Sequence, residues 1–143
     1  MSTKIKFDRH SIKFRLWMYY EHMKTTEVNS VASSIYHAYA RGDTGLTEAI
    51  QDLSISNDFY VMMESGGKVL LFMPEAESLV PVYQYKDQIP KLRGMLQEAP
   101  AKTTAVSFRI NTGLEKYNTL AYATYLSRTK NQEVFLYIFS PLY

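Results

Sequence analysis

The residues that most often perform chemistry in proteins are few in this chain and form no catalytic pattern. Its 143 residues include no cysteine and only three histidines. His10 lies in a basic segment, and His22 and His37 are too far apart to share a metal as ligands one helical turn apart would. The sequence contains no phosphate-binding loop, dinucleotide-binding motif, nucleophile elbow or zinc-protease motif. It therefore predicts no enzyme, no cofactor and no metal site.

Four other side chains are candidates for binding a ligand. Arg109 lies between two large apolar residues in a segment that alternates like a strand. If its face is covered, the guanidinium needs a carboxylate of the fold or an anionic ligand, whereas on an open face Arg109 is a surface residue. Tyr83, Tyr122 and Tyr125 could supply pocket hydroxyls, because a tyrosine ring packs while its hydroxyl takes a polar partner. The alternative is that these rings belong to a tyrosine-rich sheet.

The charge distribution argues against binding to nucleic acid. The formal net charge is +2, but residues 1–15 carry five basic side chains and one acidic one, a balance of +4. The rest of the chain carries eleven basic and thirteen acidic side chains, a balance of −2. The basic character therefore belongs to the N-terminal tail, and no nucleic-acid partner is expected.

These candidate residues must be positioned by a mixed set of helices and strands. Apolar spacing predicts a long helix over residues 20–41, in which Val28, Val31 and Ile35 fall three and four positions apart. That face of the helix is predicted either to pair two copies of the chain or to pack on a sheet, and both alternatives stay open.

The remaining pattern alternates between short helices and strands. The segments Phe59–Met63 and Lys68–Phe72 are apolar runs on either side of a glycine turn, which predicts a hairpin. The other predicted elements are helices near residues 44–53 and 88–97 and strands near residues 104–111, 117–128 and 134–139. Hairpin connections require antiparallel pairs, so the sequence predicts an α+β fold with a sheet of about five antiparallel strands and helices mainly on one face.

Residues 1–19 form a basic tail that ends in an apolar, aromatic segment. Basic flanks followed by Trp and Tyr are typical of the cytoplasmic side of a membrane span. The apolar run stops at Glu21, however, far short of the roughly 20 residues that cross a bilayer. Two explanations stay open: the tail begins an ordinary amphipathic helix, or it flanks a membrane segment that this sequence lacks.

Three segments in order resemble one family of receptors. They are the tail from Lys4 to Tyr19, the stretch from Leu46 to Phe72, and the end of the chain from Phe135 to Tyr143. The first is similar to the cytoplasmic start of bacterial membrane sensor histidine kinases. The second and third resemble the first helix and hairpin, and the last strand, of the extracellular PAS-like (PDC or Cache-type) sensor domains of those kinases.

The resemblance implies a juxtamembrane-like tail over residues 1–19 and a PAS-like sensor domain over residues 20–143. Such a domain senses a small-molecule or protein signal on the extracellular face of the bacterial cell membrane. It acts as a homodimer anchored through flanking membrane helices, which this sequence lacks, and relays the signal through its terminal helices. The phosphoacceptor helix and the ATP-binding domain are also absent, so the implied kinase activity belongs to the parent protein. The alternative is a free-standing cytosolic PAS-like or profilin-like domain that binds a protein.

Overall fold

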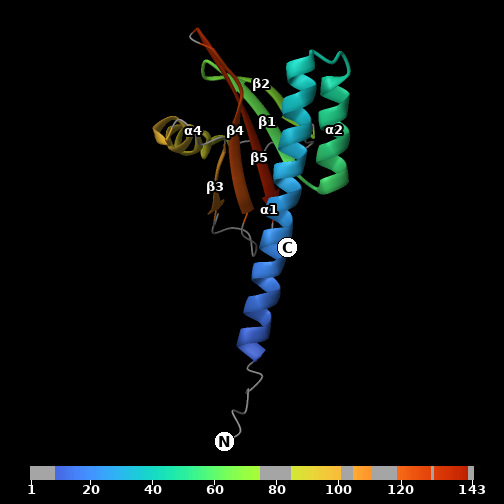
Figure 1. Ribbon diagram of the computed structural model, residues 1–143, viewed down its shortest axis with the longest axis vertical. Helices are drawn as coiled ribbons and strands as arrows, with labels where there is room; N and C mark the ends of the chain where they lie inside the picture. The colour runs from blue at the N-terminus through green and yellow to red at the C-terminus, as the bar shows by residue number, and fades with distance from the viewer. Residues whose placement is uncertain (1–8, 75–84, 101–104, 111–118, 130, 142–143) are drawn as a thin grey trace, which may run out of the picture.

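The structure is a computed structural model and describes residues 9–74, 85–100, 105–110, 119–129 and 131–141. Figure 1 shows a sheet flanked by helices, with one long helix extending beyond it. The elements are α1 (Arg9–Arg41), α2 (Leu46–Asn57), β1 (Tyr60–Ser65), β2 (Lys68–Met73), α4 (Ile89–Glu98), β3 (Ala105–Ile110), β4 (Thr119–Thr129) and β5 (Gln132–Pro141).

The five strands form one antiparallel sheet in the order β2-β1-β5-β4-β3. The last strand of the chain, β5, therefore lies at the centre of the sheet. Its residues from Val134 onward are buried without interruption, because apolar side chains point to both faces and each face is covered. The predicted α+β class, with a long N-terminal helix and a five-stranded antiparallel sheet, is confirmed.

Each face of the sheet has its own apolar core. The α1-side core lies beneath α1 and α2, and the α4-side core lies beneath α4. Successive residues of a strand point to opposite faces, so β5 contributes Val134, Leu136 and Ile138 to the α1-side core and Phe135, Tyr137 and Phe139 to the α4-side core. Helices α1 and α2 share one face, as expected, and α4 covers the other.

Helix α1 is longer than the sequence predicts. It begins at Arg9 rather than near residue 20, and it ends at Arg41 as expected. No proline or glycine occurs between these positions, so nothing in the sequence interrupts the helix. The tail is thus helical from Arg9, which is compatible with both explanations for residues 1–19. No helix in the described part of the chain is both long and apolar enough to span a membrane.

The β1–β2 hairpin forms where the glycine turn predicts it. Gly66 and Gly67 both have positive φ, at 59° and 80°, a conformation that glycine adopts without steric cost. The tight turn pairs Ser65 with Lys68. Farther along, the ladder contains a bulge opposite Met63 and Glu64, which leaves an extra residue on the edge strand β2.

The packing of α1 against the sheet gives the first prediction. Ile35 is 1% exposed in the α1-side core, whereas Ile55 on α2 is 62% exposed. Replacing Ile35 with alanine is expected to lower the free energy of unfolding by about 2–5 kcal/mol, because it leaves a cavity. The matched change Ile55→Ala should cost less than about 0.5 kcal/mol. Urea unfolding of both variants checks this, and equal losses would contradict the packing described.

Candidate functional site

Two of the four predicted ligand residues lie at positions where the structure describes no side chain. Arg109 is on β3, the edge strand, where its backbone is paired with Leu120 of β4. Its side chain, and the whole of Tyr83, lie outside the described residues. A ligand role for Arg109 or Tyr83 therefore stays a prediction.

The other two predicted residues lie on opposite faces of the sheet. Tyr122 is buried in the α1-side core, where burial raises the pKa of its hydroxyl. Tyr125 packs on the α4-side core, with its ring centroid 5.0 Å from that of Phe135. The structure thus does not bring these two hydroxyls together, and a ligand role for either stays a prediction.

The residues predicted at a dimer contact are used within the chain itself. Val28, Val31 and Ile35 are 0%, 6% and 1% exposed in the α1-side core. This corrects the expectation for these three side chains and matches the alternative of a helix that packs on the sheet. A dimer formed through α1 stays a prediction, but it must use another face of the helix.

Sequence reasoning missed a buried polar cluster under α4. Glu64 lies near the end of β1 and is 3% exposed. Its carboxylate accepts hydrogen bonds from Arg93 Nη2 of α4, at 2.6 Å, and from the Tyr137 hydroxyl of β5, at 2.9 Å. Both oxygens of the carboxylate are thereby satisfied, as a buried charge requires. The cluster ties α4 to two neighbouring strands.

Strand geometry explains why these groups meet. Glu64 is two residues after Met62 and therefore points to the same face, into the α4-side core. Its partner across the ladder is Phe135, and Tyr137 follows two residues later on the same face of β5. Arg93 lies on α4 one residue after Leu92, which is fully buried in this core.

Two members of the cluster, Tyr137 and Arg93, have raised pKa values and keep their protons to higher pH than usual. Burial raises the pKa of Tyr137, and the hydrogen bond and negative charge of Glu64 raise it further against the opposing effect of Arg93. Burial alone would lower the pKa of Arg93, but its interactions with Tyr137 and Glu64 outweigh that effect and raise it. A neutral tyrosine and a charged guanidinium that both resist deprotonation are poor acid–base catalysts near neutral pH. The cluster is therefore better suited to holding α4 on the sheet, or to binding a ligand, than to acid–base catalysis.

A polar pocket of about 280 Å³ opens beside this cluster. It lies between the β1–β2 turn (residues 64–67), two residues of α4, and the start of β5 with the turn before it (residues 131–133 and 135). Ser65 Oγ donates a hydrogen bond of 2.9 Å to the backbone oxygen of Glu133. That bond fixes the glycine turn against β5 on one side of the pocket.

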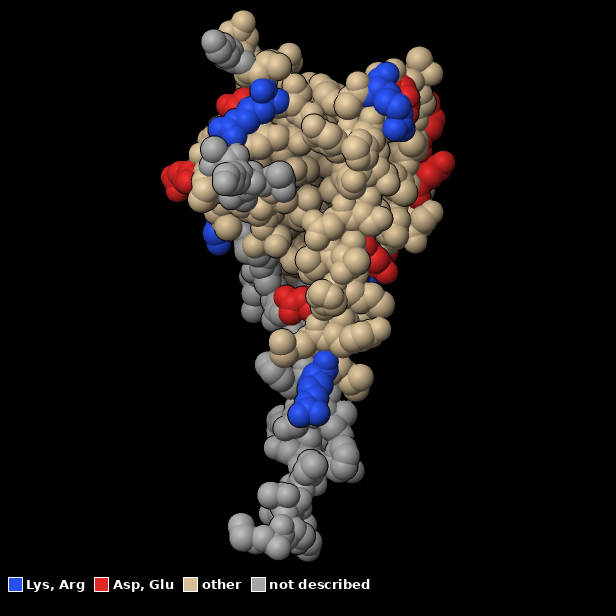
Figure 2. Space-filling model, viewed as in Figure 1, with Lys and Arg blue, Asp and Glu red and all other residues tan. Residues whose placement is uncertain are grey.

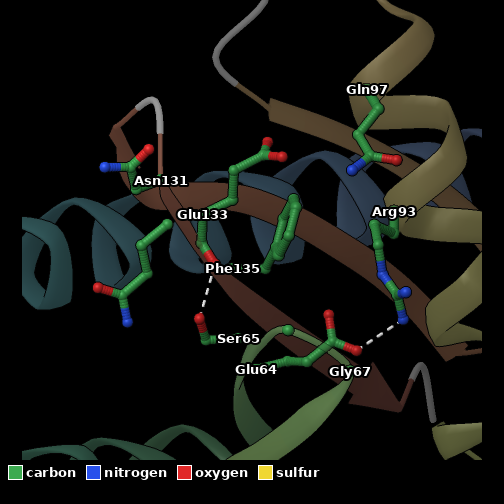
Figure 3. A pocket seen from close by; sticks show the side chains of 10 residues that line it. Glu64, Ser65, Gly67, Arg93, Gln97, Asn131, Glu133 and Phe135 are labelled. Atoms are coloured by element: carbon green, nitrogen blue, oxygen red, sulfur yellow. Dashed lines mark hydrogen bonds and ion pairs between the residues drawn. The ribbon is translucent and has the colours of Figure 1, made fainter.

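Figure 3 shows how the lining side chains are directed. The Gln97 carboxamide of α4 and the Glu133 carboxylate of β5 point toward each other across the pocket. The Phe135 ring stands between Glu133 and Arg93, whose side chain reaches down to Glu64. Arg93 Nε is buried and has no hydrogen-bond partner among the described residues. The pocket thus combines a carboxylate, an amide, an aromatic ring and an unused N–H donor.

Other charged features of the molecule are dispersed. On the face shown in Figure 2, the basic and acidic side chains of the described residues form small separate groups. Within the described residues, no three histidine, aspartate or glutamate side chains gather closely enough to hold a metal ion. The pocket beside Glu64 is therefore the candidate functional site of the described residues.

The raised pKa of Tyr137 predicts a loss of stability at alkaline pH. Above about pH 10, the ordinary value for tyrosine, the unfolded chain releases this proton while the folded chain keeps it, so the free energy of unfolding falls as pH rises. Tyr137→Phe should remove up to about 1.4 kcal/mol per pH unit from that slope. Urea unfolding between pH 9 and 11 measures it. The half-exposed Tyr36, changed to Phe, is the control, and parallel curves for wild type and Tyr137→Phe would refute the effect.

Comparison with known proteins gives one structural neighbour. No family model matches the chain, and no curated protein matches it. Among solved structures, the chain is similar to the sensor domain of the zinc-responsive histidine kinase CzcS from Pseudomonas aeruginosa, with 17% sequence identity and a TM-score of 0.40. The similarity covers 82% of this chain and 94% of that one. The neighbour is thus a sensor domain of a histidine kinase, the class of protein that the sequence segments resemble.

Proposed function

We propose that this chain is the signal-sensing domain of a two-component sensor histidine kinase. The domain lies on the extracellular face of the bacterial cell membrane in the parent protein, and α1 and β5 relay its state to a kinase core outside these 143 residues. Two things support the proposal: the resemblance of the sequence segments to such kinases, and the placement of α1 beside the end of the central strand.

The placement of α1 is the observation that carries the proposal. Lys24 Nζ lies 5.6 Å from the centroid of the Phe59 ring, and Phe59 directly precedes β1. The first residue of β1, Tyr60, pairs with Phe139 near the end of β5. Helix α1 therefore leaves the sheet at the edge where β5 ends, and its N-terminal part continues beyond the sheet, as Figure 1 shows.

This geometry suits the relay of a small displacement. The C-terminal half of α1 packs on β5 in the α1-side core, so a shift between the two requires the core to repack. Packed interfaces tend to change between discrete arrangements rather than deform continuously. A signal that binds one arrangement more tightly than the other shifts the balance between them. A rigid helix then carries that change outward from the sheet.

Rotation of α1 tests this relay. In a chimera, residues 1–143 replace the ectodomain of a reporter histidine kinase, and one to four alanines are inserted after Tyr19, an exposed residue beyond the sheet. Each added residue rotates the outer helix by about 100° relative to the sheet. Kinase output, measured as phosphoryl transfer, is expected to vary with this number and to return near its starting value at four residues.

The control for the chimera is the same set of insertions at the exposed Asp43, in the turn after α1. These insertions leave the path from β5 to the outer helix unchanged, so kinase output should stay constant. If kinase output does not change with the number of alanines inserted after Tyr19, a relay through α1 is contradicted.

The proposal includes pairing of two copies through the exposed side of α1. Leu16, Tyr19 and Met23 are 64%, 68% and 39% exposed and follow one another at spacings of three and four. Apolar residues at this spacing form one stripe along a helix, and pairing two such stripes removes them from water. This stripe lies outside the core that holds Val28, Val31 and Ile35.

Charge placed on the stripe should separate the pair. The double change Leu16→Glu and Met23→Glu is expected to shift sedimentation from dimer to monomer, because it places four carboxylates at one interface. Ile55→Glu, on an exposed position of α2, should leave the dimer intact. A wild-type monomer, or the same shift in both variants, would show that this stripe is not the interface.

A further inference from the structure

The size of the pocket beside Glu64 limits what it can hold. Its volume is about 280 Å³. A water molecule occupies about 30 Å³ in the liquid, so the pocket has room for roughly nine non-hydrogen atoms. A small metabolite fits entirely within this space, whereas a peptide or a nucleotide could place only one group in it.

The charges around the pocket favour a cation. The lining contains two carboxylates and one guanidinium. The guanidinium of Arg93 is already paired with Glu64 at 2.6 Å. The second carboxylate, on Glu133, has Arg128 as its cross-strand neighbour, but the Arg128 guanidinium stacks 4.7 Å from the centroid of the Tyr125 ring. Among the described residues no cation forms an ion pair with Glu133, so this carboxylate can accept a cationic group of a ligand.

An aromatic ring lies beside that charge. The Phe135 ring lines the pocket next to Glu133 (Figure 3). A cation between a carboxylate and the face of a ring gains both charge pairing and cation–π attraction. In Figure 3 the Gln97 carboxamide points its nitrogen toward Glu133. A half-turn of this amide exchanges the two ends and presents its oxygen as an acceptor for an N–H group. An ammonium group suits these partners, because it donates three hydrogen bonds and carries a compact positive charge.

Arg93, at the other end of the pocket, carries a buried donor. Within the part of the chain that the structure describes, Arg93 Nε is buried without a hydrogen-bond partner, a state that costs free energy unless an acceptor is supplied. The Nη2 atom of the same guanidinium is held by Glu64, so a ligand reaches Nε when the Arg93 side chain turns slightly about that contact. An oxygen acceptor a few atoms away from the ammonium group would satisfy it.

From these contacts we infer that the pocket between the β1–β2 turn, α4 and β5 binds a small ammonium compound that also carries an oxygen acceptor. The ammonium group lies between Glu133, the Phe135 ring and Gln97, and the acceptor faces Arg93 Nε. Binding requires only these residues. A role of this ligand as the signal rests on the proposed sensing function.

Titration of the whole chain with four small probes tests the inference. Ethanolamine and glycine both carry an ammonium group and differ in the acceptor, a hydroxyl or a carboxylate. Ethylene glycol and glycolate carry the same acceptors without the ammonium group. Calorimetry should show saturable binding of at least one ammonium probe and none of the other two. In ¹⁵N NMR spectra, the Arg93 Nε–H signal should shift on binding.

Two substitutions predict opposite changes in affinity. Glu133→Gln should weaken binding of the ammonium probe about tenfold or more, the usual effect of losing a charge-assisted hydrogen bond. Gln97→Glu places a second carboxylate across from Glu133 and should tighten binding. The matched control Glu48→Gln, on the exposed surface of α2, should leave the affinity unchanged.

Three results would overturn the inference. They are the absence of binding by both ammonium probes, preferential binding of glycolate, and an equal loss of affinity in Glu133→Gln and Glu48→Gln. None of them bears on the relay through α1, which the alanine insertions test without any ligand. Conversely, binding with the predicted pattern would stand even if the insertions left kinase output unchanged.

Discussion

The position of β5 at the centre of the sheet is the constraint on which the rest of the structure depends. This strand is paired on both edges, with β1 and β4, and covered on both faces. Its alternate side chains enter the two separate cores, so α1 and α4 both pack on it from opposite faces of the sheet. Close-packed interiors transmit displacement. A change at the pocket under α4 is therefore expected to reach α1 through β5.

The cluster of Glu64, Arg93 and Tyr137 determines how α4 sits on that strand. A buried ion pair adds little net stability, since the cost of removing two charges from water offsets their attraction. Its directional bonds, however, allow α4 few alternative positions over β1 and β5. The same arrangement leaves Arg93 Nε, at the edge of the pocket, without a partner among the residues that the structure describes. The cluster thus links the docking of α4 to whatever ligand occupies the pocket.

The sequence predicted elements better than it predicted sites. Two apolar runs around Gly66 and Gly67 indicated the hairpin, and an uninterrupted apolar run indicated the central strand. The start of α1 was placed too late, because the basic and aromatic pattern of residues 1–19 was interpreted as a separate juxtamembrane-like tail, although no proline or glycine separates it from the helix. The Glu64 cluster joins residues 29 and 73 positions apart, so only the strand register brings them together. One signal was present: Glu64 directly follows the apolar run Phe59–Met63, at a position that alternation points toward the core.

Coupling through β5 is tested most directly by asking whether a ligand bound in the pocket under α4 moves α1 on the opposite face of the sheet. The chain has no cysteine, so nitroxide labels can be attached to cysteines introduced only at the exposed positions Met18 and Leu70, on α1 and β2. Pulsed electron paramagnetic resonance gives the distribution of distances between them. When an ammonium probe that binds in calorimetry is added to saturation, we expect the populations of two label-to-label distances to change. A distribution unchanged by the bound ligand would contradict the claim that β5 couples the pocket to the helix.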